Sequence, residues 1–166
     1  MNIILQIILE LLIAAVLALV LRRWVFLLVF VKGHSMKDSL LSGDLLFATR
    51  RRRRNAVKRF DVVLCRYPNR RELFVKRVIA LPGEVFSMSD DTVYINGKAI
   101  EEPFSKRHCL REVKEIQLAD HEYFVMGDNR PISRDSRNRA VGPIADENIV
   151  AIVRCIVLPP RRIGKI

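Results

Sequence analysis

An apolar run near the N-terminus constrains this chain more than any other feature. The nineteen residues 3–21 include one acid, Glu10, and one amide, Gln6, among otherwise apolar side chains. At the rise of an α-helix these residues cover roughly 28 Å, close to the hydrocarbon thickness of a bilayer. A small domain has little room to bury such a helix on all sides, so a buried core helix is the weaker alternative. We predict one transmembrane anchor over residues 1–22.

Residues 23–166 are expected to form a single domain of mainly β structure. With 166 residues in all and 50% apolar side chains, the chain suits one cored domain plus the N-terminal appendage. Runs rich in β-branched and aromatic residues and bounded by turn residues predict strands. These runs are residues 24–31, 45–49, 60–67, 72–80, 93–100 with a tight turn at Asn96-Gly97, 123–126 and 149–158. Residues 87–122 otherwise lack recognisable chemistry and are expected to form a small cap or insertion.

The cysteines give no sign of a structural site. Cys65, Cys109 and Cys155 are odd in number and form no CxxC pair, so they indicate neither a disulfide framework nor a zinc site. His108, beside Cys109, has no second ligand at a usable spacing, which favours a surface histidine. We therefore expect no metal.

The chain is strongly basic. It carries 29 Lys and Arg against 18 Asp and Glu, a formal net charge of +11, which predicts a polyanionic partner such as anionic lipid or nucleic acid. The arginine run at residues 50–54 fits a solvated loop and a lipid-contacting patch about equally. Nucleic-acid binding ranks behind both because no aromatic residues interleave the run. Arg22, Arg23 and Lys32 follow the apolar run, so a count of basic residues places the β domain in the cytoplasm.

Ser35, just after the anchor, is a candidate nucleophile. A serine hydroxyl needs a nearby base to take its proton, and Lys76 is the candidate base. If Lys76 faces inward with Phe74 and Val78, burial lowers the pKa of its amine, as a lysine base requires. The alternative is an ordinary surface lysine at a strand edge.

A second polar stretch covers residues 127–137. It combines Gly, Asp, Asn and Ser with charges of both signs, a composition that ordinary turns also have. The more specific interpretation is a rigid loop, held by Asp–Arg pairs, that presents a serine to the active site.

Four motifs, in order along the chain, resemble those of bacterial type I signal peptidases, in the short form typical of Gram-positive bacteria. Residues 33–36, with Leu40 and Gly43-Asp44, resemble the nucleophile motif of that family. Residues 74–84 are similar to its lysine motif, and residues 93–104 to the segment that follows. The stretch Gly127-Asp128-Asn129-Arg130, with the residues up to 137, is the most specific match. Several ordered motifs carry far more weight than any one alone.

The resemblance implies a role for each site residue. Ser35 attacks the scissile carbonyl, Lys76 acts as general base, and Ser133 orients Lys76. The backbone N–H of Ser35 contributes to the oxyanion hole, and Gly33 stands where some members carry a serine that adds a donor. Two ion pairs hold the loop: Asp128 with Arg77, and Asp135 with Arg137.

The resemblance also implies fold, function and location. It implies a signal-peptidase-like antiparallel β fold with a small cap insertion, behind one transmembrane helix. The expected activity is that of a membrane-anchored serine endopeptidase that cuts signal peptides from secretory preproteins after small residues at −3 and −1. No metal or other cofactor is expected, and the partners are preproteins and membrane lipid, not nucleic acid. The expected location is the cytoplasmic membrane, single-pass, with the catalytic domain on the outer face, which overrides the charge count.

One departure and two alternatives remain open. The family usually has Pro-Thr where this chain has Asp38-Ser39, which puts rate and substrate preference in doubt. A non-catalytic assembly factor for surface or pilus proteins is the first alternative, although such relatives tend to lose the serine or the lysine. A membrane-tethered nucleic-acid-binding module built on the arginine run is the second.

Overall fold

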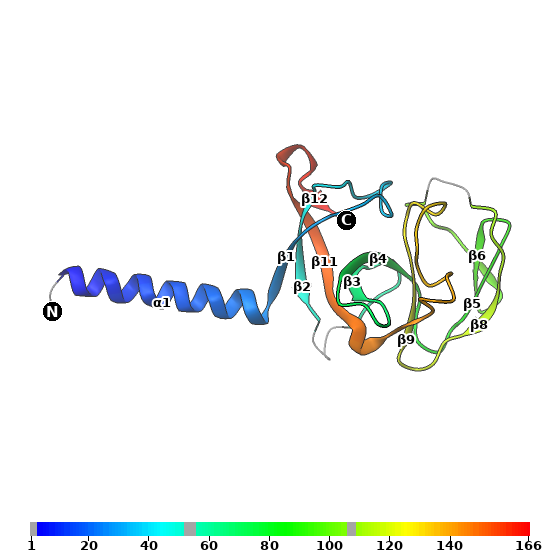
Figure 1. The fold of residues 1–166 in the computed structure, drawn as a ribbon, viewed down its shortest axis with the longest axis horizontal. Coiled ribbons are helices and arrows are strands. Elements are labelled where there is room, and N and C mark those ends of the chain that lie inside the picture. The colour runs from blue at the N-terminus through cyan, green and yellow to red at the C-terminus, as the bar shows by residue number, and fades with distance from the viewer. Residues whose placement is uncertain (1–2, 52–55, 106–108) are drawn as a thin grey trace.

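Helix α1 (Ile3–Trp24) projects as a single rod from a β domain (Figure 1). The computed structural model describes residues 3–51, 56–105 and 109–166, without the side chains of residues 20–24. The predicted helix is confirmed, and its described side chains are exposed all round, from Ile3 at 74% to Leu19 at 63%. The predicted membrane span is not confirmed, because no helix within these described ranges is long and apolar enough to cross a bilayer.

The main sheet contains eight strands in the order β1-β2-β11-β3-β4-β9-β10, with β12 paired to β11. All its pairings are antiparallel, so the predicted mainly β fold is confirmed. Its strands are β1 (Phe26–Phe30), β2 (Leu45–Arg50), β3 (Val62–Arg66), β4 (Leu73–Ala80), β9 (Glu122–Met126), β10 (Ile144–Ala145), β11 (Ile149–Leu158) and β12 (Gly164–Lys165). Two 3-10 helices flank β11: η1 (Asp146–Asn148) and η2 (Pro160–Arg162).

A second sheet forms the end of the molecule farthest from α1 (Figure 1). Its four strands, in the order β7-β6-β5-β8, are β5 (Val85–Ser89), β6 (Thr92–Ile95), β7 (Lys98–Ile100) and β8 (Val113–Gln117). Three of its strands lie within the segment predicted as a cap over 87–122, and β5 overlaps the start of that segment. Phe86 of β5 stacks on Phe124 of β9 at 3.8 Å between ring centroids, which joins the two sheets through one apolar core.

Six strands of the main sheet form at predicted runs, because apolar side chains recur there at the period of a strand, whereas β5, β8, β10 and β12 were not predicted. Strands β3 and β4 form the predicted hairpin, with Val63 opposite Lys76. Asn96 and Gly97 form the tight turn between β6 and β7, with φ of 51° and 75°, which Asn and Gly tolerate best. The β3–β4 hairpin carries Lys76 and Arg77, and the loop with residues 127–137 follows the neighbouring strand β9.

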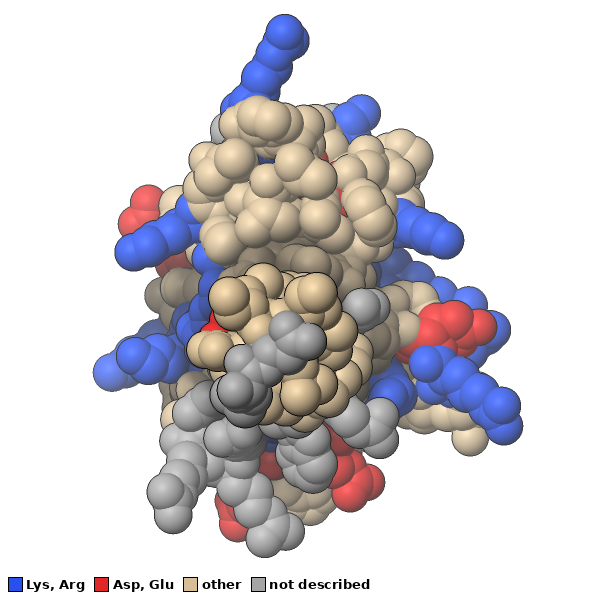
Figure 2. Space-filling view, turned by 90° about the vertical axis from the view of Figure 1, so that its left-hand side faces the viewer, with Lys and Arg blue, Asp and Glu red and all other residues tan. Residues whose placement is uncertain are grey.

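Viewed along α1, basic side chains project from the top and from both sides of the domain (Figure 2). The arginine run begins next to the end of α1, because the Arg50 N–H donates to the Val25 carbonyl at 2.8 Å. A solvated loop would leave Arg51 exposed, but its side chain is largely buried and its guanidinium pairs with Asp146 at 2.5 Å. The rest of the run up to residue 54, and His108, lie outside the described residues.

Candidate active site

The segment after β1 places Ser35 on a short turn. Gly33 adopts φ of +92°, a conformation that glycine reaches without strain and that turns the chain toward the domain. The Leu40 N–H donates to the Met36 carbonyl at 2.6 Å, and both of these side chains are buried in the core. The turn is therefore anchored by apolar contacts, while Ser35 is only half-buried.

Lys76 lies at the centre of the main sheet, on β4. Its side chain is only 3% exposed, and its Nζ lies 2.7 Å from Ser35 Oγ and 3.0 Å from the Val75 carbonyl oxygen. Strand alternation puts it on the same face as Phe74 and Val78, as the sequence predicts. Burial lowers the pKa of Lys76 below its ordinary value, although the negative charge of Asp135 acts in the opposite direction. The burial excludes the alternative of a surface lysine.

Ser133 does not take its implied position on Lys76. Its Oγ is buried and makes no hydrogen bond to Lys76, whose amine contacts Ser35 and the Val75 carbonyl instead. The hydroxyl lies against Gly127, where an added Cβ would overlap both Ser133 Oγ and the carbonyl oxygen of Ser35. Gly127 thus allows two segments of the site to meet.

Both implied ion pairs are present and buried. Arg77 binds Asp128 with two bonds of 2.9 and 2.7 Å, and Arg137 binds Asp135 with two bonds of 2.8 and 2.9 Å. Burial raises the pKa of Asp135, but the hydrogen bonds and charge of Arg137 outweigh it, so the pKa lies below its ordinary value. The Gly127 N–H also donates to Asp135, at 3.0 Å. These pairs fix the 127–137 loop beside β4.

Sequence reasoning missed a set of contacts that hold the nucleophile turn. Arg77 donates to Ser39 Oγ at 3.2 Å, while Arg162 of η2 donates to the Ser39 carbonyl at 3.0 Å and to buried Asp44 at 3.0 Å. Ser39 therefore keeps a hydroxyl acceptor where the family usually has threonine. Gly43-Asp44 belongs to the nucleophile motif, but nothing in the sequence pattern links it to residue 162.

Two further residues join the motif loop to its surroundings. Asn129 donates from its backbone to the Ser35 carbonyl and from its side chain to the His34 carbonyl, both at 3.0 Å. Arg130 binds Glu102 through two bonds of 2.8 and 2.5 Å, and Glu102 lies between β7 and β8 of the second sheet. The loop, the nucleophile turn and the second sheet are thus connected.

The described residues offer no evident place for a metal. No group of three His, Cys, Asp or Glu side chains within them is arranged to hold an ion. The three cysteines are free thiols, and burial raises the pKa of Cys65 to about 12, which keeps its thiol neutral.

An antiparallel β domain with a serine hydroxyl within hydrogen-bond distance of a buried lysine amine has the geometry of a serine–lysine peptidase. Comparison with known proteins gives the family. The family model described as signal peptidase, peptidase S26, matches residues 4–158. The chain belongs to this signal peptidase family, whose members are serine endopeptidases that remove signal peptides.

Individual relatives support the assignment. Signal peptidase I T of Bacillus subtilis (strain 168) is 36% identical over 158 residues, covering 89% of this chain and 81% of that protein. Signal peptidase I V of the same strain is 35% identical over 161 residues, covering 85% and 91%. A crystal structure of a signal peptidase I from Enterococcus faecalis V583 matches with a TM-score of 0.52 and 28% identity, covering 59% of this chain and 97% of that chain. The resemblance and the fold inferred from the sequence are confirmed.

Proposed function

We propose that Ser35 and Lys76 are the nucleophile and general base of this signal peptidase, and that it cleaves after small residues at −3 and −1. The contact of 2.7 Å between Lys76 Nζ and Ser35 Oγ carries the proposal. A buried amine with a lowered pKa is unprotonated at a lower pH than an exposed lysine, so it is available to accept a proton. The Asp38-Ser39 departure leaves this contact in place.

The reaction follows from these two groups. Ser35 Oγ attacks the scissile carbonyl carbon while Lys76 Nζ takes the hydroxyl proton. The oxyanion receives a hydrogen bond from the Ser35 backbone N–H, which stabilises the transition state by about 3 kcal/mol in comparable sites. Lys76 then protonates the leaving amine, and the C–N bond breaks to leave an ester on Ser35. Water, deprotonated by Lys76, hydrolyses the ester, and Ser35 recovers its proton from Lys76.

The surrounding contacts have a positioning role in this scheme. The Arg77–Asp128 and Asp135–Arg137 pairs hold the loop that carries Asn129, and Asn129 holds the Ser35 carbonyl. Ser133 packs against Gly127, and its hydroxyl makes no hydrogen bond to the Lys76 amine. Fixed geometry of this kind keeps the Ser35 hydroxyl and its base aligned for attack.

A preprotein cleavage assay tests the proposal directly. The full chain in detergent or lipid should cut a preprotein with an Ala-X-Ala site, and should leave a matched preprotein with large residues at −3 and −1 intact. Inactivity on the first substrate would count against the proposal and would favour the non-catalytic assembly role.

The location is proposed from the exposed helix and the basic side chains of the domain. A helix that is apolar on all sides is unfavourable in water, so α1 is suited to attach the protein to the cytoplasmic membrane. The Lys and Arg side chains that project around the domain suit anionic lipid head groups (Figure 2). Cleavage of secretory preproteins requires the β domain on the outer face, where preproteins emerge, against the count of basic residues. Protease added outside intact spheroplasts should digest the β domain, whereas protection from that protease would contradict this orientation.

The acidic limb of the pH profile should report Lys76. Since only the unprotonated amine acts as base, kcat/KM should rise with pH through the Lys76 pKa and level off below its ordinary value of 10.5. In the unfolded chain the pKa is ordinary, so between the two pKa values the unfolded state binds more protons and stability rises with pH. Rate and unfolding measurements across pH would show both trends. A limb centred at the ordinary lysine value would contradict the desolvated base.

A further inference from the structure

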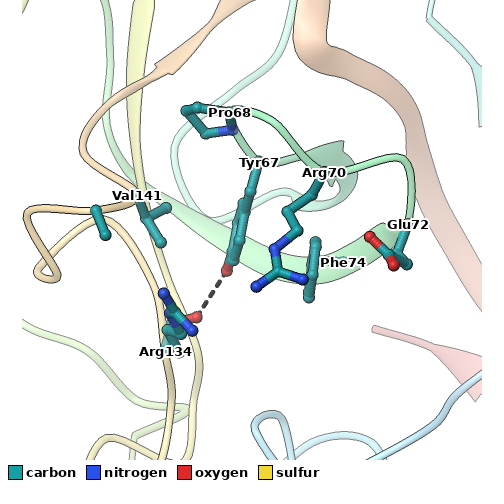
Figure 3. Close-up of a pocket in the computed structure, with 8 residues that line it drawn as sticks. Tyr67, Pro68, Arg70, Glu72, Phe74, Arg134 and Val141 are labelled. Atoms are coloured by element: carbon teal, nitrogen blue, oxygen red, sulfur yellow. Dashed lines mark hydrogen bonds between the residues drawn. The ribbon is translucent and has the colours of Figure 1, made fainter.

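A cavity of about 360 Å³ opens on the β3–β4 hairpin beside the catalytic strand (Figure 3). The stacked rings of Tyr67 and Phe74 form one side of it, with ring centroids 4.0 Å apart and an interplanar angle of 5°. The Tyr67 hydroxyl donates to the Arg134 carbonyl at 2.7 Å, which ties the hairpin to the motif loop. We call this the Tyr67 cavity; its lining is Tyr67, Pro68, Arg70, Glu72, Phe74, Arg134, Ala140 and Val141.

The lining of the Tyr67 cavity comes within two residues of Lys76 along β4 and within one of Ser133 in the motif loop. Phe74 precedes Lys76 by two residues on the same face of β4, a separation of roughly 7 Å. Arg134 follows Ser133 in the motif loop. In the proposed mechanism Lys76 protonates the leaving amine, so the first residue of the mature chain must lie beside Lys76. An extended chain advances about 3.3 Å per residue, so a mature chain that runs from Lys76 toward Phe74 reaches this cavity with its second or third residue.

The chemistry of the cavity favours an acidic side chain. Figure 3 shows the guanidinium groups of Arg70 and Arg134 on either side of the Tyr67 hydroxyl, with Glu72 beyond Phe74. Among the described residues neither arginine forms an ion pair, so both charges remain available. With two cations against one acid, the lining attracts anions.

We propose that the Tyr67 cavity is a subsite for the first residues of the mature chain and that it selects an acidic side chain at the second or third of them. The carboxylate accepts from Arg70 and Arg134, while the aromatic stack packs against its methylenes. This inference rests on the proposed function, because the mature chain enters through the leaving-group side of the Ser35–Lys76 pair.

The test compares three preproteins with one Ala-X-Ala site that differ only in Asp, Asn or Lys at the second or third mature residue. For the full chain in detergent, kcat/KM should be about threefold to tenfold higher with Asp than with Asn, and lowest with Lys. High salt should narrow these ratios. Arg70→Gln with Arg134→Gln should bring the Asp-to-Asn ratio to about one, since both cations are lost. Arg134→Glu should reverse the order in favour of Lys.

Arg71→Gln is the matched control, because Arg71 is an exposed neighbour outside the lining. It should keep the Asp-to-Asn ratio, and an equal loss of the ratio there would assign the effect to general surface charge. Equal cleavage of the three substrates by the wild type would overturn the subsite alone. Failure to cut any of them would instead overturn the proposed function. If Arg134 variants do not fold, Arg70→Gln by itself should still lower the ratio.

Discussion

Replacing Lys76 with methionine should lower kcat by about 10³-fold or more while leaving the β domain folded. Methionine keeps the length of the lysine stem and its apolar packing, but it has no lone pair that can take the proton from Ser35 Oγ at 2.7 Å. Stability should not fall, and below the Lys76 pKa it should rise, because methionine removes a buried ammonium. Single-turnover cleavage and thermal unfolding measure both effects.

Ser35→Ala should be equally inactive, because it removes the attacking oxygen, and the double variant should be no worse than either single one. Lys98→Met is a suitable control, since Lys98 is exposed on β7 of the second sheet, away from β4. Folded Lys76→Met protein that retained more than about a tenth of wild-type kcat would show that another group, or solvent, serves as the base.

The local pattern of apolar runs and turn residues was sufficient to predict most strands of the main sheet. Strand β11 begins and ends at the predicted residues because a long run of β-branched side chains stops at Pro159-Pro160, which cannot continue a ladder. The β3–β4 hairpin was predictable for a similar reason, since Pro68-Asn69 separates two apolar runs. Sheet order was not, because β11 lies between β2 and β3, and pairings over such separations leave no periodic signal.

The candidate site was likewise only partly predictable from the sequence. Ser35 and Lys76 stood out because a nucleophile requires a base, and two ion pairs followed from the family motif. The contacts of Arg162 with Asp44 and Ser39 join positions more than 100 residues apart, and neither end is unusual for a surface loop. Only the folded chain reveals that the C-terminal segment supports the nucleophile turn.

The orienting role that the family motif implies for Ser133 stays a prediction, because its hydroxyl makes no hydrogen bond to Lys76. Its hydroxyl lies in the site, yet Lys76 contacts Ser35 and a carbonyl oxygen instead.

Gly127→Ala should lower kcat by about 100-fold or more, with a smaller effect on KM. A Cβ at this position would overlap Ser133 Oγ and the Ser35 carbonyl oxygen, closer than real Cβ atoms approach other groups. The Ser35 carbonyl cannot easily move away, because the Asn129 N–H holds it at 3.0 Å and buried Met36 follows it. The clash must then shift Ser35 relative to Lys76, and an error of about 1 Å in a reacting pair is costly.

Gly164→Ala provides the matched control for this glycine. It makes the same chemical change at a position where an added Cβ meets nothing within 4 Å and where φ is not positive. Its kcat should therefore equal that of the wild type, which separates the clash from any general effect of replacing glycine in this chain. Gly127→Ala with near-normal kcat would mean that the 127–137 loop yields without moving Ser35, and that the two segments are less tightly coupled than their contacts imply. Loss of kcat with an unchanged unfolding midpoint would instead place the whole effect on the geometry of the Ser35–Lys76 pair.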